Sequence, residues 1–168
     1  SEDIMATEVS ICANALRKLG DDPITSLTDD TERARICNAL YAPARDAVLR
    51  SHPWNFAITR ASLAQLSATP VYGFDYQFAL PTDPFCLRVL SMEFEDYIFK
   101  VENLSTQGRV LLTDQETAKI IYIARVTDTT LFDSLFVDTL IAKLAADLAY
   151  PVTNSGKNTS NTNKFYCR

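Results

Sequence analysis

The sequence predicts an α+β fold in which a helical bundle of about four helices carries an inserted small antiparallel β lobe. Apolar residues have helical spacing up to residue 66, short β-prone runs replace them between residues 72 and 125, and helical spacing returns after residue 128. The chain has 168 residues, 47% hydrophobic and 22% charged, which suffices for one compact core. We expect a bundle from residues 3–69 and 128–151, a β lobe from residues 70–127, and a flexible or partner-ordered tail from residues 152–168.

The first two helices are predicted from apolar residues that recur at steps of three and four. Residues 5–19 form the first, and Gly20 follows as a helix-ending residue. Residues 29–52 form the second, with Asp29 as its N-cap and Glu32 completing the capping pattern. Pro43 lies inside this helix and removes one amide donor, so we expect a bend or a local break there.

A third helix is predicted over residues 54–66. Its apolar pattern starts at Trp54, and Pro53 suits the first helical position. The helix should end before Pro70, where the character of the chain changes.

The β lobe is predicted from short runs rich in β-branched and aromatic residues, separated by Pro, Asp, Asn and Gly. These runs are residues 76–80, 87–92, 97–102, 109–112 and 119–124. Their short connections favour antiparallel pairing.

The last helix is the most periodic segment, and Asp128 or Thr129 can cap it. We expect it to end near Pro151, because proline disfavours a helix through the preceding residue. Residues 152–168 are rich in Asn, Thr, Ser and Lys without a period, which favours an irregular tail.

Composition argues against several classes of function. The formal net charge is −5 and no Lys/Arg cluster occurs, which opposes tight binding to a nucleic-acid backbone. No run approaches the roughly 20 apolar residues of a membrane span, and the first residues are acidic where a signal peptide is basic. We therefore expect a soluble protein that is made in a cytoplasm.

The residue types for catalysis, metals and cofactors are sparse. His52 is the single histidine, which removes most catalytic and metal constellations. The cysteines at positions 12, 37, 86 and 167 lack CxxC spacing, and Cys12 and Cys37 are interpreted as small buried hydrophobes. The four glycines form no nucleotide-binding motif. We therefore predict that the chain has no catalytic, cofactor-binding or metal-binding residue and that it is not an enzyme.

Three carboxylates are the basis of an alternative prediction, in which the protein is an enzyme. Glu93, Glu95 and Asp96 cluster in the β lobe, and a glycosidase needs two carboxyl groups across a cleft. A tail-associated cell-wall hydrolase is therefore kept as a second hypothesis, although carboxylates on one strand and turn are more often simply solvated. An ordinary bacterial interaction module is a third.

A resemblance adds information that chemistry does not. The matching segments in the first third are ALRKLG (15–20), ITSL (24–27), ERA (32–34) with CN (37–38), YAPARD (41–46) and HPWNFA (52–57). Those further on are ALPTD (79–83), CLRVL (86–90), YIARVTD (122–128), FD (132–133) with LFV (135–137), and KLAA (143–146). In order and spacing these segments resemble the tail tubular protein A family of short-tailed bacteriophages, over residues 9–154.

The resemblance implies a virion head-to-tail connector, the adaptor between portal protein and tail nozzle. It implies assembly as a dodecameric ring through whose lumen genomic DNA passes without specific binding. The chain departs from the family after residue 154, where members often continue into a further long helix.

Arg45 and Asp46 follow Pro43, and two interpretations stay open for them. They can satisfy backbone groups exposed by a proline bend, which is favoured, or they can cross to an adjacent subunit of a ring.

Overall fold

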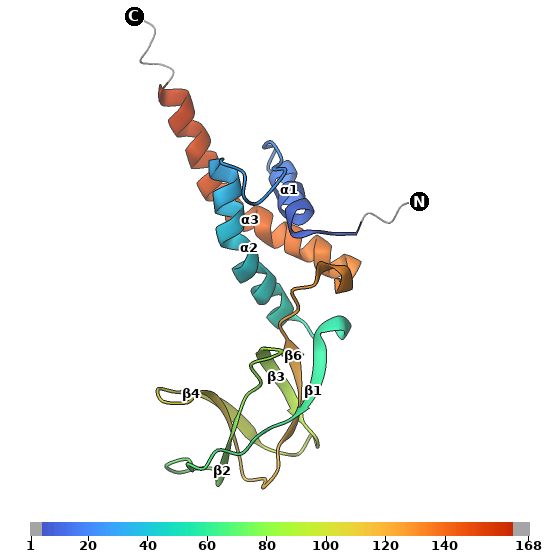
Figure 1. The fold of residues 1–168 in the computed structure, drawn as a ribbon, viewed down its shortest axis with the longest axis vertical. Coiled ribbons are helices and arrows are strands. Elements are labelled where there is room, and N and C mark those ends of the chain that lie inside the picture. Colours follow the sequence, from blue (N-terminus) through green and yellow to red (C-terminus); the bar gives the residue numbers. More distant parts are fainter. Residues whose placement is uncertain (1–4, 163–168) are drawn as a thin grey trace, which may run out of the picture. The chain divides into compact units, whose positions relative to one another are not determined.

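The structure, a computed structural model, describes residues 5–162 (Figure 1). The chain forms two compact units, described here separately. The helical unit comprises the described parts of residues 1–48 and 127–168, and the β unit comprises residues 49–126. Residues 49–69, which were expected in the bundle, thus belong to the second unit.

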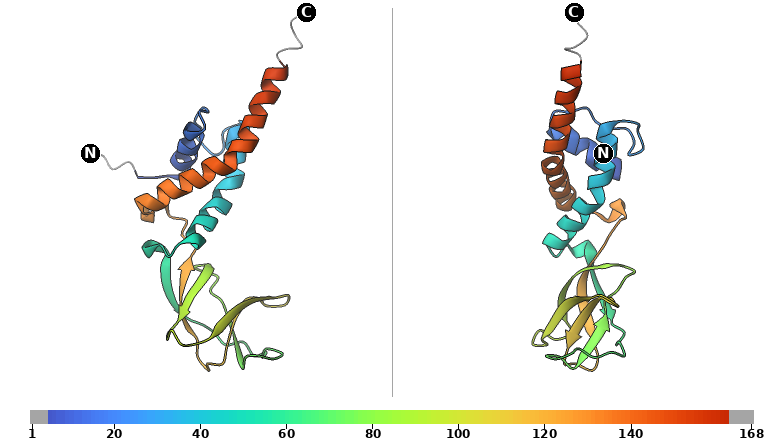
Figure 2. Two further views of the ribbon diagram at one scale, coloured as in Figure 1. Left: turned by 180° about the vertical axis from the view of Figure 1, so that it is seen from behind. Right: turned by 90° about the vertical axis from the view of Figure 1, so that its left-hand side faces the viewer.

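Three α-helices are described: α1 (Glu8–Lys18), α2 (Glu32–Ser51) and α3 (Ser134–Thr162). A 3-10 turn, η2 (Thr129–Leu131), precedes α3, and Asp128 caps this turn. At the start of α3 the Leu135 amide donates to Asp133 Oδ1 at 2.7 Å, so neither of the two predicted residues caps the long helix. In the helical unit α1 packs against α3 (Figures 1 and 2). The shared core consists of fully buried aliphatic and aromatic side chains, including Ile11, Leu16, Phe136, Leu140 and Leu144.

Local hydrogen bonds fix the ends of α1. The Thr7 side chain accepts from the Ser10 amide at 3.1 Å, and the Ser10 hydroxyl oxygen accepts from the Thr7 amide at 2.8 Å. At the other end Gly20 has φ +73°, a conformation that glycine adopts without steric cost, and its amide donates to the Arg17 carbonyl. Gly20 therefore ends the helix as predicted.

The start of α2 differs from the prediction. Thr31 is the capping residue, since its Oγ1 accepts from the Ala34 amide at 3.2 Å. Asp29 instead binds the Thr25 and Ser26 amides in the preceding loop. Further along, α2 continues through Pro43 without the expected break.

The predicted bundle of about four helices is wrong, because residues 54–66 are not helical. They form a 3-10 turn, η1 (Asn55–Ala57), and a strand, β1 (Ile58–Ser62). The strand pairs antiparallel with β6 (Lys119–Ala124), from Ile58↔Ile123 to Ser62↔Lys119. Its exposure alternates from residue to residue, and such a short run fits either period, so strand pairing decides the outcome.

The β unit contains two three-stranded antiparallel sheets, with orders β1-β6-β3 and β2-β5-β4. The remaining strands are β2 (Tyr76–Ala79), β3 (Cys86–Met92), β4 (Phe99–Leu104) and β5 (Gly108–Thr113). The five predicted runs overlap β2 to β6, so the mixed α+β character holds although the bundle does not. A core that includes Phe78, Met92, Leu111, Ile120 and Tyr122 joins residues from both sheets.

The last helix extends further than predicted. α3 runs through Pro151 to Thr162, so residues 152–162 are helical rather than irregular, and residues 163–168 lie outside the described residues. A proline removes one hydrogen bond, but the helix continues where packing compensates. Val152 directly after the proline is buried, which supplies such packing.

Candidate functional site

The most exposed apolar side chains of the β unit lie on the connection between β1 and β2. Val71 is 98% exposed and Tyr72 is 88% exposed. Beside them is a groove of about 540 Å³, which residues of the connection share with β4. From the connection it is lined by Pro70, Val71, Tyr72 and Phe74, and from β4 by Lys100, Glu102 and Leu104. Neighbouring exposed apolar side chains beside a groove make this region a candidate interaction site.

The groove borders an open sheet edge. β4 pairs with β5 on one side and stands at the end of the strand order. β2, at the opposite end, is bridged further by Gln65↔Phe78, and its Ala79 amide donates to the Ala64 carbonyl at 3.0 Å. Four consecutive residues of β4 are exposed, so its outer side can accept another strand.

The sequence interpretation missed both features. Val71 and Tyr72 lie outside every predicted helix and strand, and their residue types alone do not show that they stay exposed. Edge position depends on which strands pair, and this was not visible in the sequence.

The carboxylates of the hydrolase hypothesis do not line one cleft. Glu93 borders a groove of about 340 Å³ together with Arg60 and Lys119, and it is the one carboxylate among the described residues that line it. Its Oε1 lies 3.2 Å from the Lys119 Nζ. Glu95 and Asp96 are exposed on the turn that follows β3. This arrangement provides no pair of carboxyl groups across the groove.

His52 packs rather than joins a catalytic group. Its ring meets Trp54 edge-on, with centroids 4.8 Å apart, and its carbonyl accepts from the Trp54 amide at 2.9 Å. Trp54 itself is buried.

The cysteines that the structure describes are buried. Cys12 and Cys37 are fully buried, which confirms their interpretation as small hydrophobes. A hydrogen bond with Cys37 and burial raise the pKa of the Cys12 thiol far above its ordinary value, and burial raises that of Cys86. Both effects disfavour a thiolate at Cys12 and at Cys86, whereas the hydrogen bond with Cys12 lowers the pKa of Cys37. Cys167 lies outside the described residues, and within residues 5–162 no cluster of three potential ligands could hold a metal ion.

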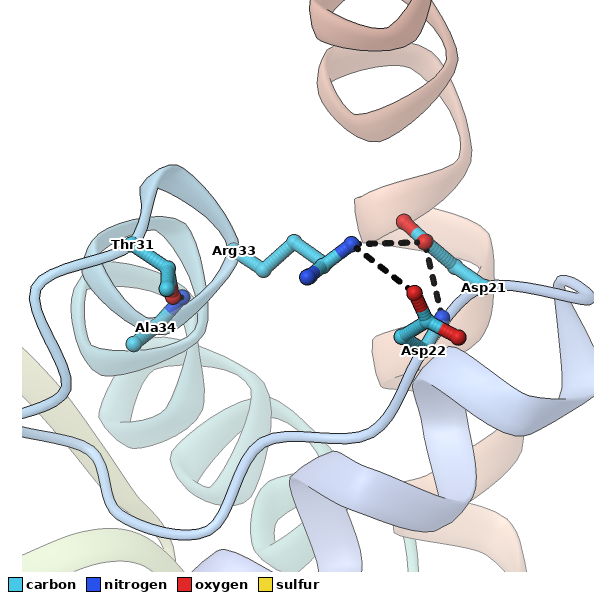
Figure 3. Close-up of polar contacts among 5 residues, drawn as sticks. All are labelled: Asp21, Asp22, Thr31, Arg33 and Ala34. Atoms are coloured by element: carbon cyan, nitrogen blue, oxygen red, sulfur yellow. Dashed lines mark hydrogen bonds and ion pairs between the residues drawn. The ribbon is translucent and has the colours of Figure 1, made fainter.

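A charged cluster fixes the connection between α1 and α2 (Figure 3). One terminal nitrogen of Arg33 lies 3.1 Å from an Asp21 oxygen and 3.8 Å from an Asp22 oxygen. The Asp22 amide donates to the Asp21 carboxylate, so the three residues form one network. Because local partners account for these contacts, the cluster is interpreted as structural.

Arg45 is buried within α2. Its Nε and a terminal nitrogen each lie 3.1 Å from Asp46 Oδ1, and its guanidinium lies over the Tyr41 ring at 6.0 Å from the centroid. Within a single chain, the Arg45 side chain therefore contacts Asp46 and Tyr41 of the same helix.

At its C-terminal end α3 extends beyond α1 (Figures 1 and 2). Tyr150 on this part of the helix is 77% exposed. No helix among the described residues has the length and apolar character of a membrane span.

The chain matches no known protein-family model. No curated protein matches it either.

Proposed function

We propose that the chain is a structural subunit of the head-to-tail connector of a short-tailed bacteriophage. In this proposal twelve copies form a ring in the virion between the portal protein and the tail nozzle. The observation that carries the proposal is the ordered set of segments, spread over residues 9–154, that resembles the tail tubular protein A family.

The two-unit architecture suits this role. A closed ring needs two different surfaces on each subunit, because every contact between neighbours is heterologous. Further surfaces must meet the portal on one side and the nozzle on the other. The exposed Val71 and Tyr72 in the β unit, and Tyr150 near the end of α3, supply apolar contact surface on both units.

The charge also suits the role. A net charge of −5 and the lack of a Lys/Arg cluster favour a lumen through which DNA slides without being held. The proposal therefore includes passage of DNA without specific binding.

The proposed role is structural and requires no turnover. A peptidoglycan lysis assay addresses the hydrolase hypothesis directly, with Glu93→Gln as the test variant and Glu116→Gln as a carboxylate control. Robust lysis that is lost only in Glu93→Gln would overturn the structural role.

The decisive experiment is electron microscopy of the protein mixed with the portal protein encoded in the same phage genome. We expect a ring seated on the portal, and monomers or small oligomers without it. Assembly need not rescue an exposed core, since both units bury their own, so the portal acts as a template. Absence of binding to the portal would contradict the proposal, and stable rings without the portal would contradict the template step.

A further inference from the structure

The outer side of β4 is an unpaired sheet edge with an unusual charge pattern. Register runs from Phe99↔Thr113 to Leu104↔Gly108 on the β5 side. No described strand pairs with the other side. Lys100 and Glu102 are exposed, and two residues apart on a strand they share one face of the sheet.

Exposed apolar side chains flank these charges. Ile98, which directly precedes β4, is 73% exposed, and Val101 between the two charges is 42% exposed. An edge of this kind is a template for another strand.

We infer that β4 pairs antiparallel with β4 of a second copy of this chain, in a register centred on Val101. In this register Lys100 lies opposite Glu102 of the second copy, and Glu102 lies opposite its Lys100. Ile98 meets Leu104 of the second copy, and the two Val101 side chains meet on the opposite face. The β2-β5-β4 sheets of the two copies thereby become one continuous sheet across the dimer.

Charge selects this register over its neighbours. When two copies of one strand pair antiparallel about a two-fold axis, the axis passes between one residue and the same residue of the second copy. The register is therefore defined by that central residue. Centring the pair on Lys100 or on Glu102 places two like charges directly opposite each other, which is destabilising. The register centred on Val101 forms two opposite-charge pairs.

A lysine on an edge strand usually discourages pairing. Here Glu102 two residues away changes the effect of Lys100, because self-pairing neutralises both charges. The edge is therefore protected against arbitrary strands and complementary to itself.

This contact is isologous and closes at two copies. It is thus separate from the heterologous contacts of the proposed ring and describes the free protein. Its test contains no portal, so a failure here leaves the ring proposal standing.

Sedimentation equilibrium of the full chain provides the test. We expect a monomer–dimer equilibrium whose dissociation constant rises with salt, because the paired charges are exposed to screening. Lys100→Glu and Glu102→Lys should each weaken the dimer about tenfold or more, because both charge pairs become repulsive. Lys18→Glu, an equal charge change on exposed α1 surface, should leave it unchanged.

Charge exchange makes the test specific for the register. An equimolar mixture of Lys100→Glu and Glu102→Lys should restore a heterodimer, because each Glu then faces a Lys. The double variant with both changes should restore the homodimer for the same reason. Thermal melting of each variant checks that the exposed substitutions leave the fold intact.

Three results would overturn the inference: a wild-type chain that stays monomeric at millimolar concentration, a dimer indifferent to salt, or a mixture that associates no better than either variant alone. If one single variant folds poorly, the double variant still decides between the two outcomes.

Discussion

The helical unit and the β unit satisfy their backbone hydrogen bonds in different ways. Helices bond internally, and the termini of α1 and α2 are closed by Thr7, Gly20 and Thr31. Of the two sheets in the β unit, the sheet β2-β5-β4 leaves one side of β4 open, beside the exposed Val71 and Tyr72. A sheet finishes its bonding only by closing or by meeting another chain, so we expect the β unit to be more prone to strand-mediated association.

The largest expected effect tests whether burial separates core from contact surface within the β unit. Trp54→Ala should lower the free energy of unfolding by about 3 to 5 kcal/mol, because a buried aromatic side chain is removed. Tyr72→Ala, at 88% exposure, is the matched control and should change it by less than about 0.5 kcal/mol. Both free energies are measured by urea unfolding, monitored by far-UV circular dichroism because Trp54 is the single tryptophan and its fluorescence is lost in the variant. An unchanged stability of Trp54→Ala with impaired assembly would move Trp54 from the core to an interface.

The next effect tests the helical unit and has the opposite sign. Pro151→Ala should raise the stability of α3 by up to about 3 kcal/mol, because it restores an amide donor inside a helix that runs to Thr162. Helical circular dichroism and thermal melting measure the gain. Pro70→Ala, in the β1–β2 connection, is the control for a proline outside a helix. If α3 ended near Pro151, as the sequence suggested, the change would have little effect.

The segments around Trp54 and Pro151 also show how far the secondary structure could be predicted from the sequence. Strands β2 to β6 were predicted because β-prone runs and turn residues agree there. β1 was missed because the apolar positions of residues 54–66 fit a helix as well as a short strand, and pairing with β6 is not local information. The end of α3 was misplaced because Pro151 was given the weight of a stop, while the burial of Val152 depends on tertiary packing.

The candidate interaction surface was harder still to predict. Nothing in the order of residues shows that β4 ends a sheet, since β5 lies between β2 and β4 through non-local pairing. A sequence motif is defined by residue types and their spacing, which are visible in the sequence itself. Position at an edge, by contrast, is a property of the assembled sheet.

A smaller effect tests the capping of α2. Thr31→Ala should lower the free energy of unfolding by about 0.5 to 2 kcal/mol, because the Ala34 amide loses its acceptor. Thr31→Ser retains the hydroxyl and should restore most of the stability. Equal losses in both variants, measured by urea unfolding, would show that the methyl group rather than the cap contributes.

The smallest effect concerns the acid sensitivity of the loop before α2. Amide hydrogen bonds from Ser26 and Thr25 hold the pKa of Asp29 below its ordinary value of 3.8. A depressed folded-state pKa means that the charged carboxylate stabilises the fold at pH values above 3.8, and that this contribution is lost as pH falls through the lower folded value.

Asp29→Asn should therefore be less stable than wild type at neutral pH, and the difference should shrink in acid. Asp96→Asn, on the exposed turn after β3, is the matched control for removing one carboxylate. Urea unfolding at neutral pH and again below pH 3.8 measures the difference. A deficit in Asp29→Asn that stays constant across this range would show that the side chain acts through its shape rather than through its charge.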